Sequence, residues 1–195
     1  MGSGSGIACD LSTHSLLTVE HRAKYQAPDL VRRTLGYARS VAIVGLSTKR
    51  QKASFFVATF LKSRGIKIIP VHPKADRILG EKVYPTLTDI PESVDVVNVF
   101  RPPHECPVYA EQAVGIGAKV LWLQLGLFSE EAATIASAGG LDVIMDLCIK
   151  MEYGRYDGTM RFLGMNTGIL TAKKAQIGRI SSSQDMHASE CSILT

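Results

Sequence analysis

A loop rich in hydroxyl and basic side chains follows the first strongly apolar run of the chain. It reads Gly45, Leu46, Ser47, Thr48, Lys49 and Arg50, and Ser54 follows in the first turn of a predicted helix. Free N–H groups at a helix N-terminus, together with basic side chains, favour the binding of a phosphate. The loop matches neither the G-x-G-x-x-G nor the Walker pattern, because Gly45 is its only glycine. A phosphate site and an ordinary turn with solvated lysines are both compatible with this segment.

The residues after the second apolar run narrow the choice of anion. NAD-binding domains place Asp or Glu there to hold the ribose hydroxyls, whereas this chain has His72, Pro73 and Lys74. This basic end disfavours NAD and favours a ribose that carries a phosphate, as in NADP or the 3′-phospho-ADP part of coenzyme A. A surface histidine in a turn is the alternative interpretation of His72. Two further run ends supply the candidate contacts Phe100, Arg101, Pro102, Gln124 and Gly126.

Five short apolar runs, alternating with helical patterns, must position these residues. The runs cover 41–44, 66–71, 94–100, 119–125 and 141–145, and the helical patterns cover 28–39, 54–64, 105–116, 129–138 and 148–155. The alternation predicts parallel βαβ units with right-handed crossovers. We expect an α/β fold of the Rossmann-like type, a doubly wound parallel sheet of about five strands in a three-layer α/β/α arrangement. The expected strand order, counted along the chain, is 3-2-1-4-5, and ligands bind such sheets where this order reverses.

Composition divides the chain into one folded domain and its flanking segments. We expect a flexible N-terminal arm over 1–27, the domain over 28–156 with a loop at 76–91, an appendage over 157–180 and a disordered tail over 181–195. The formal net charge of +4 suits an anionic ligand, but Lys and Arg are spread along the chain, so no nucleic-acid partner is indicated. The chain has no run of 18 apolar residues and no C-x-x-C spacing. We therefore expect a cytoplasmic protein without a membrane span.

Groups that could carry out catalysis are isolated in the sequence. The five histidines show neither a Ser-His-Asp order nor a metal-ligand spacing. Cys106 and Cys148 each lie near the start of a predicted helix, where a thiolate is favoured, so either could form a mixed disulfide with a ligand thiol. A buried, unreactive cysteine is the alternative at both positions. We predict no catalytic residue.

Long segments of residues 41–156 carry a resemblance to a known family. In chain order they read VAIVGLSTKRQKAS, IKIIPVHPKADRILGEKVYPTLTDIPESVDVVNVFRPP, AVGIGAKVLWLQLGLFSEEA and LDVIMDLCIKMEYGRY, and LGMNTGILTAKK follows them. These segments resemble the small, stand-alone CoA-binding proteins of the YccU-like family. That family is related to the N-terminal domain of the succinyl-CoA synthetase α subunit. The chain departs from it at His72, where the family often has Asn, and at Leu147, where it often has a basic residue.

The resemblance implies roles for the residues at the strand ends. Gly45, Ser47 and the basic loop would contact phosphates. His72, Pro73 and Lys74 would flank the adenosine end of coenzyme A. The resemblance also implies that Phe100, Arg101 and Pro102, at the end of the third run, line the path of the pantetheine. It implies that Gln124 and Gly126 close the end of the fourth run.

We expect a protein that binds coenzyme A or acyl-CoA and has no activity on its own. One alternative is an NADP-dependent oxidoreductase, which would need a substrate domain or a catalytic Tyr/Lys or Cys/His set. Another is an interaction scaffold with a vestigial cleft. A homodimer, or a complex with an unknown protein partner, is compatible with these interpretations.

Overall fold

The computed structural model describes residues 17–156, so the predictions for 157–180 and 181–195, and for most of the arm, lie outside the described residues. In chain order the elements are α1 (Val19–Tyr25), α2 (Pro28–Tyr37), β1 (Ser40–Val44), α3 (Ala53–Ser63), β2 (Lys67–Val71), β3 (Arg77–Ile78), β4 (Glu81–Lys82), the 3-10 helix η1 (Leu87–Asp89), β5 (Val96–Val99), the 3-10 helix η2 (Pro103–Glu105), α4 (Cys106–Gly115), β6 (Val120–Leu123), α5 (Glu130–Ala138), β7 (Asp142–Ile144) and α6 (Ile149–Tyr156). Within this range no helix is long and apolar enough to cross a membrane.

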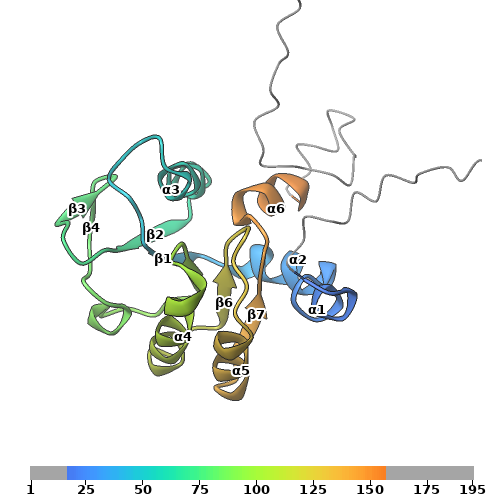
Figure 1. Ribbon diagram of the computed structural model, residues 1–195. Helices are drawn as coiled ribbons and strands as arrows, with labels where there is room; N and C mark the ends of the chain where they lie inside the picture. The colour runs from blue at the N-terminus through green and yellow to red at the C-terminus, as the bar shows by residue number, and fades with distance from the viewer. Residues whose placement is uncertain (1–16, 157–195) are drawn as a thin grey trace, which may run out of the picture.

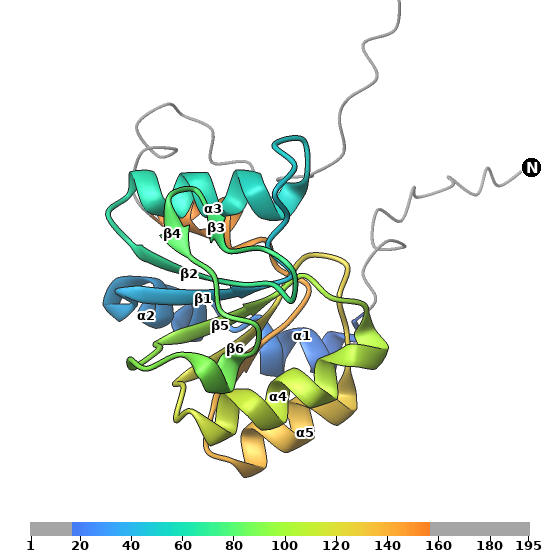
Figure 2. The same cartoon turned by 90° about the vertical axis from the view of Figure 1, so that its left-hand side faces the viewer.

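A five-stranded parallel sheet forms the centre of the domain, in the order β2-β1-β5-β6-β7. All residues of β5 and β6 are buried, as expected for strands that are covered on both faces. Helices lie on both faces of the sheet, with α4 and α5 on one side and α3 and α6 on the other (Figure 1, Figure 2). The predicted three-layer Rossmann-like α/β fold is therefore confirmed.

The predicted strand order of 3-2-1-4-5 is wrong. The third long strand, β5, pairs with β1 on the side opposite to β2, so the order of the five long strands is 2-1-3-4-5. Pro70 gives the physical reason, because proline cannot donate to a sheet and is confined to edge strands. Its carbonyl accepts a hydrogen bond from the Tyr84 N–H (3.0 Å) outside the sheet, so β2 is an edge strand.

Residues 17–26 were expected in the flexible arm, but they fold against the domain. Thr18 caps α1, since its hydroxyl accepts a hydrogen bond from the His21 N–H (3.2 Å). Leu17 and Tyr25 are buried at 3% and 5% exposure. One buried residue before a seven-residue helix and one at its end give no sustained period, which is why the sequence pattern did not predict this helix.

The segment 76–91 is a loop with a short hairpin, β3–β4, and the turn η1. Leu79 and Gly80 form the hairpin turn with φ values of 53° and 81°. Two consecutive positive φ values are the mark of a type I′ turn. This segment stands where a crossover helix would otherwise join β2 to β5.

Candidate functional site

The strand order reverses between β1 and β5, and their carboxyl ends are adjacent. The Phe100 N–H donates to the Val44 carbonyl (2.9 Å), and the Gly45 N–H donates to the Val71 carbonyl (3.1 Å). The ends of β1, β2 and β5 are thereby joined. Gly45 has φ +78°, and a Cβ built there would lie 2.9 Å from Cδ of Arg101. Glycine suits this left-handed backbone conformation and the close approach of Arg101, both of which a side chain at this position would strain.

Internal hydrogen bonds shape the loop between β1 and α3. The Ser47 N–H donates to Oγ of Ser54 (3.0 Å), and Oγ of Ser47 accepts from the Lys49 N–H (3.1 Å). Leu46 is fully buried and Ser54 is 5% exposed. The side chains of Leu46 and Ser54 therefore stabilise the loop from inside, while Thr48, Gln51 and the basic residues of the loop are exposed.

The exposed part of this loop is positively charged and leads to a helix N-terminus. Lys49, Arg50 and Lys52 are all exposed, and α3 begins without a side-chain cap. Uncapped N–H groups and the helix dipole attract anions at this end. The charge and the backbone donors together suit a phosphate group.

His72 continues β2 into a tight turn. Its N–H donates to the Tyr84 carbonyl (3.0 Å), and its Nδ1 accepts from the Lys74 N–H (3.1 Å). Because Nδ1 is the acceptor, a neutral His72 ring carries its proton on Nε2. Pro73 and Lys74 are exposed, so this strand end presents one imidazole and one ammonium group beside the end of β1.

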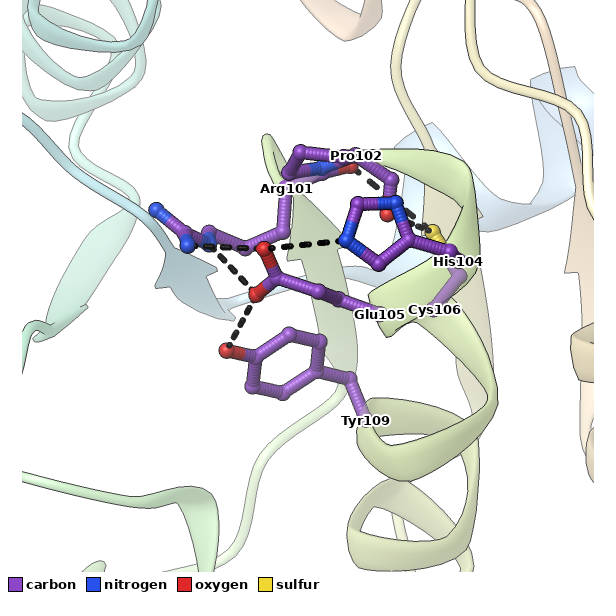
Figure 3. Close-up of polar contacts among 6 residues, drawn as sticks. All are labelled: Arg101, Pro102, His104, Glu105, Cys106 and Tyr109. Carbon is purple, nitrogen blue, oxygen red and sulfur yellow. Dashed lines mark hydrogen bonds and ion pairs between the residues drawn. The ribbon is translucent and has the colours of Figure 1, made fainter.

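Arg101 is held at the end of β5 by a cluster of polar side chains (Figure 3). Its Nε and Nη2 donate to the two carboxylate oxygens of Glu105 at 2.9 and 2.8 Å. The Tyr109 hydroxyl donates to the same carboxylate (3.5 Å), and Nε2 of His104 lies 3.9 Å from it. The hydrogen bonds from Arg101 hold the pKa of Glu105 below its usual value. Glu105 thus orients the Arg101 guanidinium, whose side chain remains 45% exposed.

Cys106 is buried beneath this cluster and is a poor nucleophile. Its thiol lies 3.5 Å from the Pro102 carbonyl and 3.8 Å from the Arg101 carbonyl, to which it donates. Burial, with a smaller effect of Glu105, raises the pKa of Cys106 to about 11. Burial and the raised pKa both favour the buried, unreactive interpretation of Cys106. Cys148 is half-buried and directly precedes α6.

The end of β6 is built differently from the other strand ends. The Gln124 side chain is 3% exposed and donates to Oδ1 of Asn98 (3.1 Å). The Leu127 N–H donates to the Gln124 carbonyl (2.9 Å), and Gly126 has φ +82°, which together describe a type II turn. The Gly126 N–H is taken by Oδ1 of Asp146 (2.7 Å). This strand end therefore presents a fixed turn in which Leu125 is 46% exposed.

The structure brings the predicted residues of β1, β2 and β5 to one edge of the sheet. The Gln124 side chain points into the buried layer instead. Contact of any of these residues with a ligand stays a prediction. Sequence reasoning missed Glu105, although its spacing of four residues from Arg101 is a signal for an ion pair. It also missed Asp146, although a polar residue directly after the last strand is the same signal that identified the other strand ends.

A family model described as "CoA binding domain" matches residues 39–154. The uncharacterized protein YneT of Bacillus subtilis is 38% identical over 123 residues, which are 63% of this chain and 91% of YneT. The ADP-forming acetate–CoA ligase II of Archaeoglobus fulgidus is 38% identical over 112 residues, which are 56% of this chain and 16% of the ligase. This chain is thus similar to most of one small protein and to a small part of a much larger enzyme.

Two solved structures have the same fold. A hypothetical protein from Pyrococcus horikoshii superposes with a TM-score of 0.66 at 34% identity, over 67% of this chain and 92% of that one. A protein from Thermus thermophilus superposes with a TM-score of 0.63 at 26% identity, over 66% of this chain and 98% of that one. The similarity extends over nearly the whole length of the two solved structures and over about two thirds of this chain.

Proposed function

The chain belongs to the CoA binding domain family, and from that premise we propose that it binds coenzyme A or an acyl-CoA at the carboxyl ends of β1, β2 and β5. The proposal includes no catalytic step, because the groups at these ends are backbone N–H groups, hydroxyls and cations that bind an anion. The observation that carries it is the uncapped N-terminus of α3 beside three exposed cations, Lys49, Arg50 and Lys52.

The charges of coenzyme A match this edge of the sheet. The ligand carries a diphosphate and a ribose 3′-phosphate, and the two basic strand ends lie side by side because the Gly45 N–H bonds to the end of β2. We assign the diphosphate to the Lys49–Lys52 loop and the 3′-phosphate to His72 and Lys74. Pantetheine then extends past Arg101, which lies over Gly45.

Isothermal titration with coenzyme A, acetyl-CoA, 3′-dephospho-CoA, NADP and NAD at matched salt tests the ligand class. We expect micromolar binding of the two CoA compounds that carry the 3′-phosphate, and much weaker binding of the others. A clear NADP signal without a CoA signal would replace this proposal with the oxidoreductase interpretation. Absence of measurable binding by every compound would favour a scaffold with a vestigial cleft.

The double variant Lys49→Ala/Arg50→Ala tests where the phosphates lie. Loss of two charged hydrogen-bond donors should weaken CoA binding by about ten- to a hundredfold and reduce its salt dependence. Arg32→Ala/Arg33→Ala is the matched control, since both arginines are exposed. Arg33 pairs with Asp142 at the start of β7, so it lies at the amino ends of the strands, away from the proposed site. Equal affinities of the two double variants would show that the phosphate site is misplaced.

A further inference from the structure

Gln26, directly after α1, contacts the end of the last strand, β7. Its side-chain amide donates to the Met145 carbonyl (3.1 Å) and to the Asp146 carbonyl (3.4 Å). These residues are separated by about 120 positions in the sequence. The bonds therefore tie the N-terminal helix to the carboxyl edge of the sheet, where the ligand is proposed to bind.

Asp146 has a backbone conformation that needs support from its surroundings. It adopts φ 53°, which is uncommon for a residue other than glycine and is kept only where neighbouring contacts fix it. The Gln26 side chain donates to the Asp146 carbonyl, and Oδ1 of Asp146 accepts a hydrogen bond from the Gly126 N–H at 2.7 Å. A bond this short to a carboxylate is strong and directional. Asp146 thus transmits the position of α1 to the Gln124–Leu127 turn.

A second contact joins α1 to the segment that follows the same turn. The His21 ring packs against the Phe128 ring with centroids 5.1 Å apart, and its Nε2 lies 3.9 Å from the Glu130 carboxylate. Tyr25 of α1 belongs to the buried core cluster against which Leu127 and Phe128 also pack. Helix α1 is therefore attached at two places. Gln26 bonds to the end of β7, and His21 contacts the segment that follows the turn.

The Gln124–Leu127 turn adjoins the β5 end of the proposed site, because β6 pairs with β5 and the Gln124 N–H donates to the Val99 carbonyl (3.3 Å). We propose that Gln26 and Asp146 are positioning residues that set this turn beside the ligand, and that α1 is part of the binding unit. This inference rests on the proposed function for its ligand, coenzyme A. Its structural content is independent of the ligand, because the bonds from Gln26 to Asp146 and from Asp146 to Gly126 are present in the protein alone.

Three variants of the full chain separate the side chain of Asp146 from its backbone. Asp146→Asn keeps an oxygen acceptor, and Asn tolerates the left-handed conformation, so we expect CoA affinity within about threefold of wild type. Asp146→Gly keeps the backbone but removes the acceptor, and we expect about tenfold weaker binding. Leu79→Gly, at the same φ of 53° in the β3–β4 turn, is the matched control and should bind as wild type does.

Hydrogen exchange of the ligand-free protein gives the second readout. We expect faster exchange of the Gly126 amide in Gln26→Ala and in Asp146→Gly, and unchanged exchange in Asp146→Asn and Leu79→Gly. Gln26→Ala should also weaken CoA binding by about threefold, because it removes a bond to the neighbour of the turn and not to the turn itself.

The outcomes distinguish this inference from the proposed function. Wild-type protein that does not bind CoA overturns the proposed function, and the exchange data then decide the inference alone. Wild-type protein that binds CoA, with equal affinity in Asp146→Gly, overturns the inference and leaves the proposed function standing. Unchanged exchange at Gly126 in Gln26→Ala overturns the assignment of α1 to the binding unit in either case.

Discussion

Replacing Gly45 with alanine should weaken both ligand binding and the fold, whereas replacing Gly65 with alanine should weaken the fold alone. Gly45 and Gly65 have nearly the same backbone conformation, with φ +78° and +76°, but a Cβ at Gly65 meets nothing within 4 Å. At Gly45 the added methyl group would lie 2.9 Å from Cδ of Arg101 and 3.4 Å from the Phe100 carbonyl. Gly65→Ala therefore measures the backbone cost alone, and Gly45→Ala adds the displacement of Arg101.

The expected magnitudes follow from these contacts. A left-handed conformation costs an alanine about 1–2 kcal/mol relative to glycine. Moving Arg101 also breaks its bond to Glu105, which contributes at most about 1 kcal/mol because Arg101 is 45% exposed. The free energy of unfolding should thus fall by about 1–2 kcal/mol in Gly65→Ala and by about 1–3 kcal/mol in Gly45→Ala. Each kcal/mol lowers the Tm by about 2–4 °C in a chain of this size.

Urea unfolding and CoA titration of both variants check this reasoning. We expect CoA binding to weaken about tenfold in Gly45→Ala, because the guanidinium no longer lies over the strand end, and to stay unchanged in Gly65→Ala. A CoA affinity of Gly45→Ala that equals the wild-type value would refute a role for Arg101 in binding. An equal loss of CoA affinity in Gly45→Ala and Gly65→Ala would assign the effect to backbone strain.

Three further changes test other parts of the structure. Asp95→Ala should destabilise the protein by about 2–3 kcal/mol at pH 7, because Asp95 accepts hydrogen bonds from Lys119 and two backbone N–H groups. Burial raises the pKa of Asp95, but these bonds outweigh burial and hold the pKa below its usual value. The contribution of Asp95 to stability is therefore present above about pH 4 and is lost as the pH falls through the lowered pKa. Urea unfolding should show a smaller difference in stability between wild type and Asp95→Ala at pH 3 than at pH 7. Cys106 should resist iodoacetamide in the folded protein at pH 8, because a pKa of about 11 leaves about one thiol in a thousand ionised; rapid alkylation found by peptide mapping would contradict its burial. Glu105→Gln should weaken the hold on Arg101 and lower CoA affinity by about two- to fivefold with little change in Tm, and higher CoA affinity would mean that Glu105 competes with the ligand.

The number, type and approximate bounds of the long strands and their helices were predictable from the sequence. The run Val41–Val44 ends at a glycine, and Ser129 precedes two acidic residues, so local signals define both β1 and α5. These signals lie within a few residues of the elements that they specify. Their agreement with the packed structure reflects this locality.

The order of the strands depends on long-range pairing, which local periodicity does not encode. Pro70 was nevertheless a usable signal, because an order of 3-2-1-4-5 would place its strand in the interior of the sheet. The positions of the strand ends were predictable where each end could be recognised from its own residues, as at Gly45 and His72. A contact between two strand ends, such as the bond from Gly126 to Asp146, was not predictable in this way.

The segment that replaces a crossover helix also covers part of the outer edge of the sheet. Tyr84 pairs with the outer side of β2 through its bonds to Pro70 and His72, and Pro70 offers no N–H to an incoming strand. An exposed edge strand is a template for intermolecular pairing and aggregation. The carboxyl-terminal part of β2 is thereby covered by Tyr84 and is not available for pairing with a strand of another domain, whether or not a ligand is bound.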